Sequence, residues 1–166
     1  MRPTQATSGF TLIEALLAAA ILLMAVTAIT MPYATAANTE QVEIRQTMAI
    51  GLAQELMEEM LSKPFADPDG SSSPGPEAGE ADRGQFDNMD DYDDLEEPPR
   101  QVADMEGNPV TDQVAQQLSR RATASYVYVD GQDTGLPPTF ILLQVEVRYR
   151  QAPLASLSRL AYAYGT

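Results

Sequence analysis

One carboxylate lies inside an apolar run near the N-terminus, shortly after a glycine–phenylalanine pair. Glu14 stands within the 22 residues from Phe10 to Met31, and that run contains no lysine or arginine. A carboxylate inside a membrane segment is costly unless it lies near the interface or is paired with a cation. A cut after Gly9 would create such a cation, the new α-amine of Phe10. Glu14 could then meet the amine of its own helix or that of a staggered neighbouring chain.

A run of aspartates is the second set of residues that could do chemistry. Calcium takes six to eight oxygen ligands, and carboxylates are prominent among them. The EF-hand pattern fails here, because no glycine follows the Asp-x-Asp run and the spaced glutamate is missing. A solvated acidic loop is therefore the main alternative to a calcium site. The candidate calcium ligands are Asp87, Asp90, Asp91, Asp93 and Asp94.

The composition excludes most catalytic chemistry. The chain has no histidine and no cysteine, so it lacks the commonest general base, the most reactive nucleophile and the usual zinc ligands. It also lacks a Gly-x-x-x-x-Gly-Lys phosphate loop. The formal net charge of −14 argues against nucleic acid, which proteins bind through clustered Lys and Arg. We expect no enzyme activity, no nucleic-acid partner and, calcium aside, no cofactor.

The apolar run from Phe10 to Met31 is long enough to cross a membrane. At about 1.5 Å per residue its helix would span roughly 33 Å. Arg2 and the free amine are the only positive charges ahead of it, which favours a cytoplasmic N-terminus. A plain anchor and a secretory signal peptide, cut at a small-x-small site such as residues 34–36, are alternatives. The nearly uninterrupted apolar run argues against a buried core helix.

The residues Gly9-Phe10-Thr11-Leu12-Ile13-Glu14 resemble the class III signal of type IV prepilins and type II secretion pseudopilins. In that family a short polar leader ends in glycine, and an apolar helix follows the cut. The resemblance implies a leader over residues 1–9, cleavage by prepilin peptidase between Gly9 and Phe10, and N-methylation of Phe10. It also implies that Glu14 acts in assembly, by pairing with the amine of a neighbouring subunit. The leader departs from many in the family in carrying a single basic residue.

The helical pattern continues beyond Pro32. A proline inside a helix removes a hydrogen bond, so we expect a kink or local melting there rather than an end. Lys63 and Pro64 are stop signals. We therefore expect residues 10–31 to form the membrane or filament-core helix and residues 32–65 its amphipathic continuation. The expected core face holds Met48, Ala49, Leu52, Ala53, Leu56, Met57 and Met60, with Glu55, Glu58 and Glu59 largely off it.

The segment 66–99 is acidic and rich in turn residues. It holds 12 of the 24 acidic residues and one basic residue, Arg83. Its first part, 67–76, is predicted to be mobile. We expect four apolar residues to pack the segment against the globular head, the part of the chain after the membrane helix, while the acidic side chains face water. These residues are Phe86, Met89, Tyr92 and Leu95.

Residues 100–166 predict a small antiparallel sheet. Strand patterns cover 118–130, 140–150 and 154–164. Three or four strands packed on the second half of the helix give an α+β fold, which the pilin resemblance also implies. In the second strand the predicted core face is Ile141, Leu143, Val145, Val147 and Tyr149; in the third, Leu154, Leu160, Tyr162 and Tyr164 are predicted to share one face.

Two stretches together, Glu55–Phe65 and Phe86–Tyr92, resemble MSHA-type minor pilins and proteins labelled type IV pilus modification protein. These resemblances imply a structural subunit, a minor pilin, of a type IV pilus-like filament. Alternatives are a type II secretion pseudopilin and a membrane-anchored periplasmic binding protein that does not polymerise. The resemblance implies a single pass through the inner membrane with a periplasmic head, and prepilin peptidase, other pilin or pseudopilin subunits and membrane lipid as partners.

Overall fold

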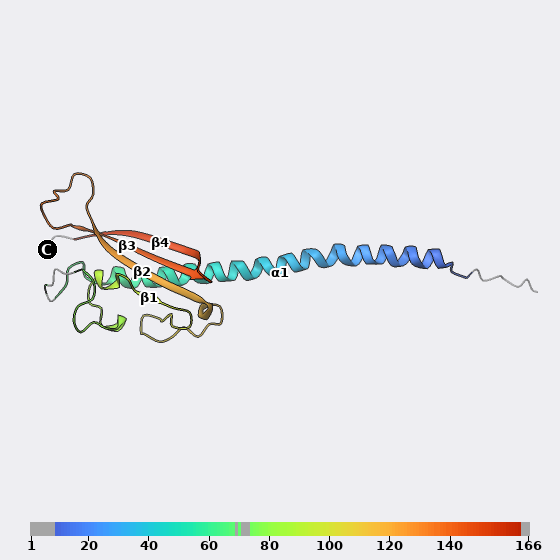
Figure 1. The fold of residues 1–166 in the computed structure, drawn as a ribbon, viewed down its shortest axis with the longest axis horizontal. Coiled ribbons are helices and arrows are strands. Elements are labelled where there is room, and N and C mark those ends of the chain that lie inside the picture. The colour runs from blue at the N-terminus through green and yellow to red at the C-terminus, as the bar shows by residue number, and fades with distance from the viewer. Residues whose placement is uncertain (1–8, 69, 71–73, 164–166) are drawn as a thin grey trace, which may run out of the picture. The chain divides into compact units, whose positions relative to one another are not determined.

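The computed structural model describes residues 9–68, 70 and 74–163, and they form an α+β fold (Figure 1). One helix, α1, is followed by short 3₁₀ turns and a four-stranded antiparallel sheet of order β1-β2-β3-β4. The elements are α1 (Leu12–Ser62), η1 (Arg83–Gln85), η2 (Asp90–Tyr92), β1 (Glu96–Glu97), η3 (Ala115–Gln117), β2 (Leu118–Val127), β3 (Phe140–Tyr149) and β4 (Ala152–Tyr162). Most of the predicted leader, residues 1–8, lies outside the described residues.

The chain divides into two compact units at Val42, within α1. In the first unit, the stretch Leu12–Tyr33 has a mean hydropathy of 2.5 and is long enough to cross a membrane. The most apolar part of this stretch is entirely exposed. This confirms the expectation of an N-terminal helix of membrane-spanning length. Such a surface is stable only when lipid or other apolar helices cover it.

The helix α1 continues through Pro32, which agrees with the expectation that this proline does not end it. Of the two predicted disturbances, a kink or local melting, melting is absent, since the residues on both sides of Pro32 are helical. The threonine hydroxyls in this part of the helix donate hydrogen bonds to carbonyls of the preceding turn. Thr30 Oγ1 donates to the Val26 carbonyl at 3.0 Å, and Thr35 Oγ1 donates to the Met31 carbonyl at 3.1 Å. These local bonds let polar side chains sit within an apolar helix.

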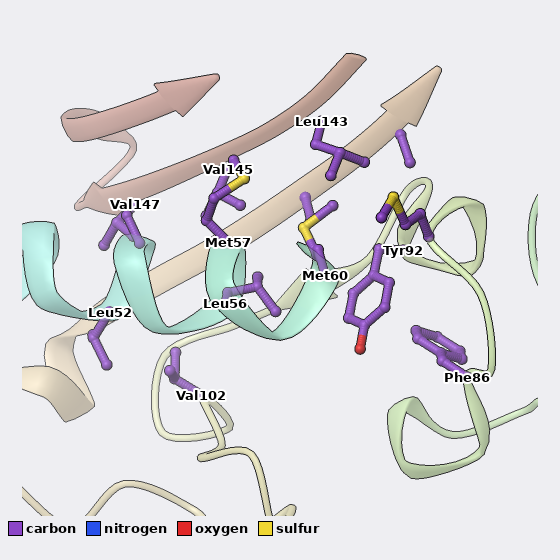
Figure 2. Packing of buried hydrophobic residues seen from close by; sticks show 14 of the residues in the cluster. Leu52, Leu56, Met57, Met60, Phe86, Tyr92, Val102, Leu143, Val145 and Val147 are labelled. Carbon is purple, nitrogen blue, oxygen red and sulfur yellow. The ribbon is translucent and has the colours of Figure 1, made fainter. Parts of the chain in front are cut away.

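The second unit has one core between α1 and the sheet (Figure 2). The helix supplies the face that the sequence predicts, except that Met48 is only partly buried. The predicted core face of β3 is confirmed, because Ile141, Leu143, Val145 and Val147 are each 0% exposed while Tyr149 packs at the edge. The helix residues in this core are Ala49, Leu52, Ala53, Leu56, Met57 and Met60.

The predicted face of the last strand is wrong. A bulge in the β3–β4 pairing leaves Leu154 as an extra residue, which changes the alternation between the two faces. Ala161 is therefore buried, while Leu160 and Tyr162 are 50% and 57% exposed. Tyr162 instead forms a cross-strand ring pair with Phe140, at 6.3 Å between centroids. Tyr164 lies outside the described residues.

The acidic segment is packed more closely than the sequence predicts. Phe86, Met89 and Tyr92 are buried, which confirms them as apolar anchors. The expectation that the acids face water is wrong for Asp90, Asp91 and Glu97, all buried, and Glu59 of α1 is buried as well. Each carboxylate accepts at least one hydrogen bond from the protein. Glu97 lies in β1, so the fourth strand comes from this segment.

Candidate functional site

Glu14 lies in the first turn of α1, where it forms a capping box with Thr11. The Thr11 amide and hydroxyl donate to Glu14 Oε2 at 3.4 and 3.2 Å, and the Glu14 amide donates to Thr11 Oγ1 at 3.3 Å. This reciprocal pair satisfies helix donors that have no partner within the helix. Sequence reasoning missed it, although Thr-x-x-Glu before an apolar run is its known signature.

Gly9 and Phe10 precede α1 and are not helical. Both are exposed, and the Phe10 side chain is 81% exposed. Exposed, irregular backbone is where proteases act most readily, because an extended chain fits a protease cleft. Glu14 lies four residues after Phe10, in the first turn of α1, and the Gly9–Phe10 peptide bond lies outside the helix.

A network of buried ion pairs joins the acidic segment to the helix and the sheet. Arg83 Nε donates to Glu59 Oε1 at 2.9 Å, and its Nη2 pairs with Glu59 Oε2. Its Nη1 donates to Glu97 Oε1 at 2.8 Å and to the Ala103 carbonyl at 3.0 Å. The fork geometry of arginine suits this kind of shared binding.

Arg120 of β2 completes the network from the other side. Its Nε donates to Glu97 Oε2 at 2.5 Å, and its side chain is fully buried. Nη1 donates to the Leu52 carbonyl of α1 at 2.9 Å, and Nη2 to the Ala103 carbonyl at 2.7 Å. Two arginines and two carboxylates give the network zero net charge, and the attraction between them offsets part of the cost of removing each charge from water.

The network also alters the pKa values of Arg83 and Tyr92. Burial opposes the charge of Arg83, but the hydrogen bonds and charges of Glu59 and Glu97 outweigh it and raise its pKa. Tyr92 donates to Glu59 Oε1 at 2.8 Å. Burial, and then this hydrogen bond to a carboxylate, raise the pKa of Tyr92, so its hydroxyl stays protonated. Arg83 and Tyr92 therefore act as structural connections, with no proton to exchange near neutral pH.

The five predicted calcium ligands are not brought together. Asp93 Oδ1 accepts the Ala124 amide at 3.1 Å, and Asp94 pairs with Arg121 at 2.6 Å on the surface. Asp90 Oδ2 accepts the Gly75 amide at 3.3 Å, and burial raises the pKa of Asp90. Of the predicted set, only Asp91 belongs to a group with ligand-like spacing among the described residues, and its companions are not aspartates. They are Glu77 and Glu80.

The remaining aspartate of the predicted set, Asp87, is half-buried beside Asp91. Its amide donates to Asp91 Oδ2 at 2.7 Å. Sequence reasoning missed Glu77 and Glu80, because a loop of unknown path gives no sign of which carboxylates converge.

No protein-family model, curated protein or solved structure matches the chain.

Proposed function

We propose that this chain is a structural subunit, a minor pilin, of a type IV pilus-like filament. The observation that carries the proposal is the position of Glu14. Its carboxylate stands in the first turn of an exposed apolar helix of membrane-spanning length, four residues after Phe10. A plain membrane anchor gives no reason for a carboxylate inside its apolar segment, because a charge in lipid is costly unless it is paired.

The proposed mechanism begins with a cut between Gly9 and Phe10 by prepilin peptidase. The cut creates a charged amine on Phe10, and its N-methylation keeps that charge. The chain would stand in the inner membrane with the leader cytoplasmic and the head periplasmic. Glu14 of an incoming subunit would then attract the Phe10 amine of the subunit already assembled, an attraction that strengthens in an apolar medium. This pairing would set the stagger between neighbouring helices.

The apolar surface of Leu12–Tyr33 then has a place in both states. Lipid covers it before assembly, and the helices of other subunits cover it in the filament. No chemical step by this chain is needed, so the proposed role is structural.

A second candidate is a membrane-anchored protein that does not polymerise. The capping box favours it, because Thr11 gives Glu14 a role inside its own chain. A type II secretion pseudopilin is an alternative within the first class and shares every N-terminal feature. The neighbouring genes, for pilus assembly or for secretion, distinguish these two filament types.

Substitutions at Glu14 and Thr11 separate the filament subunit from the anchor. The assay is the amount of the chain in sheared filaments, relative to the amount in the membrane. Glu14→Gln keeps a group that can accept the Thr11 hydrogen bonds but removes the charge. Thr11→Val keeps the charge but removes the capping hydroxyl.

For a filament subunit, Glu14→Gln and Glu14→Lys both lower incorporation about tenfold or more, and Thr11→Val leaves it within about twofold. Membrane levels stay similar in all variants. Absence of the wild-type chain from sheared filaments would favour the anchor, and incorporation of Glu14→Gln at the wild-type level would contradict the proposed pairing of Glu14 with the Phe10 amine.

A further inference from the structure

Three carboxylates in the acidic segment lie close enough together to share one ion. One carboxylate oxygen from each of Glu77, Glu80 and Asp91 lies within 4.8 Å of the others. The first two are held by a turn, in which the Glu80 amide donates to the Glu77 carbonyl at 3.1 Å and the Glu77 amide donates to Glu80 Oε2 at 2.9 Å. The Gly75 amide, which donates to Asp90 Oδ2, holds this turn beside η2.

Asp91 points independently to a missing ligand. The residue is 0% exposed, and its Oδ2 accepts amides of Asp87 at 2.7 Å and Asn88 at 3.0 Å. Its Oδ1 is also buried, yet it accepts no hydrogen bond from any residue that the structure describes. A buried carboxylate oxygen without a donor is costly and is rarely left so in folded proteins. The oxygen left over is the one that Asp91 can offer to the group.

The local charge also favours a bound cation. Three carboxylates at this spacing repel one another when ionised. Arg83 is the only basic residue between positions 66 and 99, and its guanidinium is directed to Glu59, Glu97 and the Ala103 carbonyl. The segment therefore has no side-chain cation of its own to spare for this group.

We propose that Glu77, Glu80 and Asp91 bind one divalent cation, and that the cation is calcium. Calcium binds oxygens at about 2.3–2.6 Å, so two ligands on opposite sides of one ion are about 4.8 Å apart. Magnesium needs shorter bonds and a stricter octahedron, which this spacing suits less well. Zinc prefers nitrogen and sulfur ligands. Water and main-chain carbonyls complete the six to eight oxygens.

The bound ion would fasten the loop around the Glu77–Glu80 turn to η2, and through η2 to the core. Tyr92, the last residue of η2, is buried and bonded to Glu59 of α1. Binding to the folded state alone stabilises it, so calcium should raise the melting temperature of the head. This site does not depend on the filament role proposed above.

The test is calcium binding by the full chain in detergent micelles, with calcium chloride as the only ligand. Isothermal titration should give one ion per chain with a dissociation constant of about 10⁻⁴–10⁻³ M. At ten times that concentration, the melting temperature followed by tyrosine fluorescence should rise by about 5 °C. Magnesium at the same concentration should give a much smaller rise.

Matched variants assign the site. Glu80→Gln keeps an oxygen for the Glu77 amide but loses the charge, and Asp91→Asn keeps an acceptor for its two amides; each should weaken binding at least tenfold. Glu58→Gln removes the same charge from an exposed position of α1 and should leave binding unchanged. Stoichiometric binding that Glu80→Gln does not weaken would overturn the proposal. So would the absence of calcium binding below about 10 mM, far weaker than known extracellular sites.

Discussion

Glu97 connects the two buried arginines, so its removal is the sharpest test of how the head is held together. Glu97→Gln removes the negative charge from β1 while keeping the size of the side chain. Arg120, with a fully buried side chain, would then retain only the carbonyls of Leu52 and Ala103, and Arg83 would retain Glu59 and one carbonyl. The network would change from zero net charge to one uncompensated positive charge.

The magnitude follows from this uncompensated charge. Removal of one partner from a buried ion pair typically destabilises a protein by about 3–5 kcal/mol. The amide of glutamine can still accept one hydrogen bond, so the loss should lie near the lower end, about 3 kcal/mol. Since a whole domain is stabilised by only about 5–15 kcal/mol, this loss is large.

The neighbouring residue supplies a matched control. Glu96 precedes Glu97 in β1 but points to solvent, with its side chain 70% exposed and 3.7 Å from Arg121. Glu96→Gln should cost less than about 1 kcal/mol, as is usual for exposed pairs. Both are measured as urea unfolding of the full chain in micelles, followed by near-ultraviolet circular dichroism of the tyrosines.

Two results would refute the reasoning. Equal losses for Glu97→Gln and Glu96→Gln would mean that the buried network is no more important than a surface pair. A double variant, Glu97→Leu with Arg120→Met, should recover part of the loss, because it removes the buried charge with its partner. A double variant at least as unstable as the sum of the two single ones would also contradict the account.

Two further substitutions probe the core and the ionisation of the head. Leu56 is 0% exposed between α1 and the sheet, so Leu56→Ala should lower the free energy of unfolding by about 2–5 kcal/mol. Leu61 is 40% exposed, so Leu61→Ala should lower it by less than about 1 kcal/mol. Equal losses in urea titrations would contradict the packing in Figure 2. Burial, and then the charge of Asp90, raise the pKa of Tyr126 to about 12. Because a raised tyrosine pKa stabilises the fold below the unfolded pKa of about 10, that contribution should disappear as pH rises from about 10 through 12. Tyr126→Phe should therefore lose less stability over this range than the wild type, and equal pH dependence of the urea midpoints would contradict the assignment.

Local patterns predicted the elements, and tertiary contacts decided the rest. The strict alternation from Ile141 to Val147 predicted both a strand and its buried face, because a strand between a helix and solvent needs that pattern. The face of β4 was missed because one extra residue, Leu154, changes the alternation, and no residue type marks that bulge.

Buried charges were missed for a similar reason. Glu59 looks like a solvent-facing acid on a helix until Arg83, 24 positions later, is placed beside it. Asp91 belongs with Glu77 and Glu80 because of the path of a loop, which spacing in the sequence does not give. The Thr11–Glu14 capping box was missed as well, although Thr-x-x-Glu before an apolar run is a signature that can be recognised in the sequence alone.

The intact mass of the membrane-extracted chain, with and without co-expressed prepilin peptidase, tests the central claim most directly. If the chain is a pilin-like subunit, the peptidase removes residues 1–9 and one methyl group is added to Phe10. An unchanged mass in the presence of active peptidase would contradict the account and favour a membrane anchor. A cut after Ala36 would also contradict it, because Glu14 would then be absent from the mature protein.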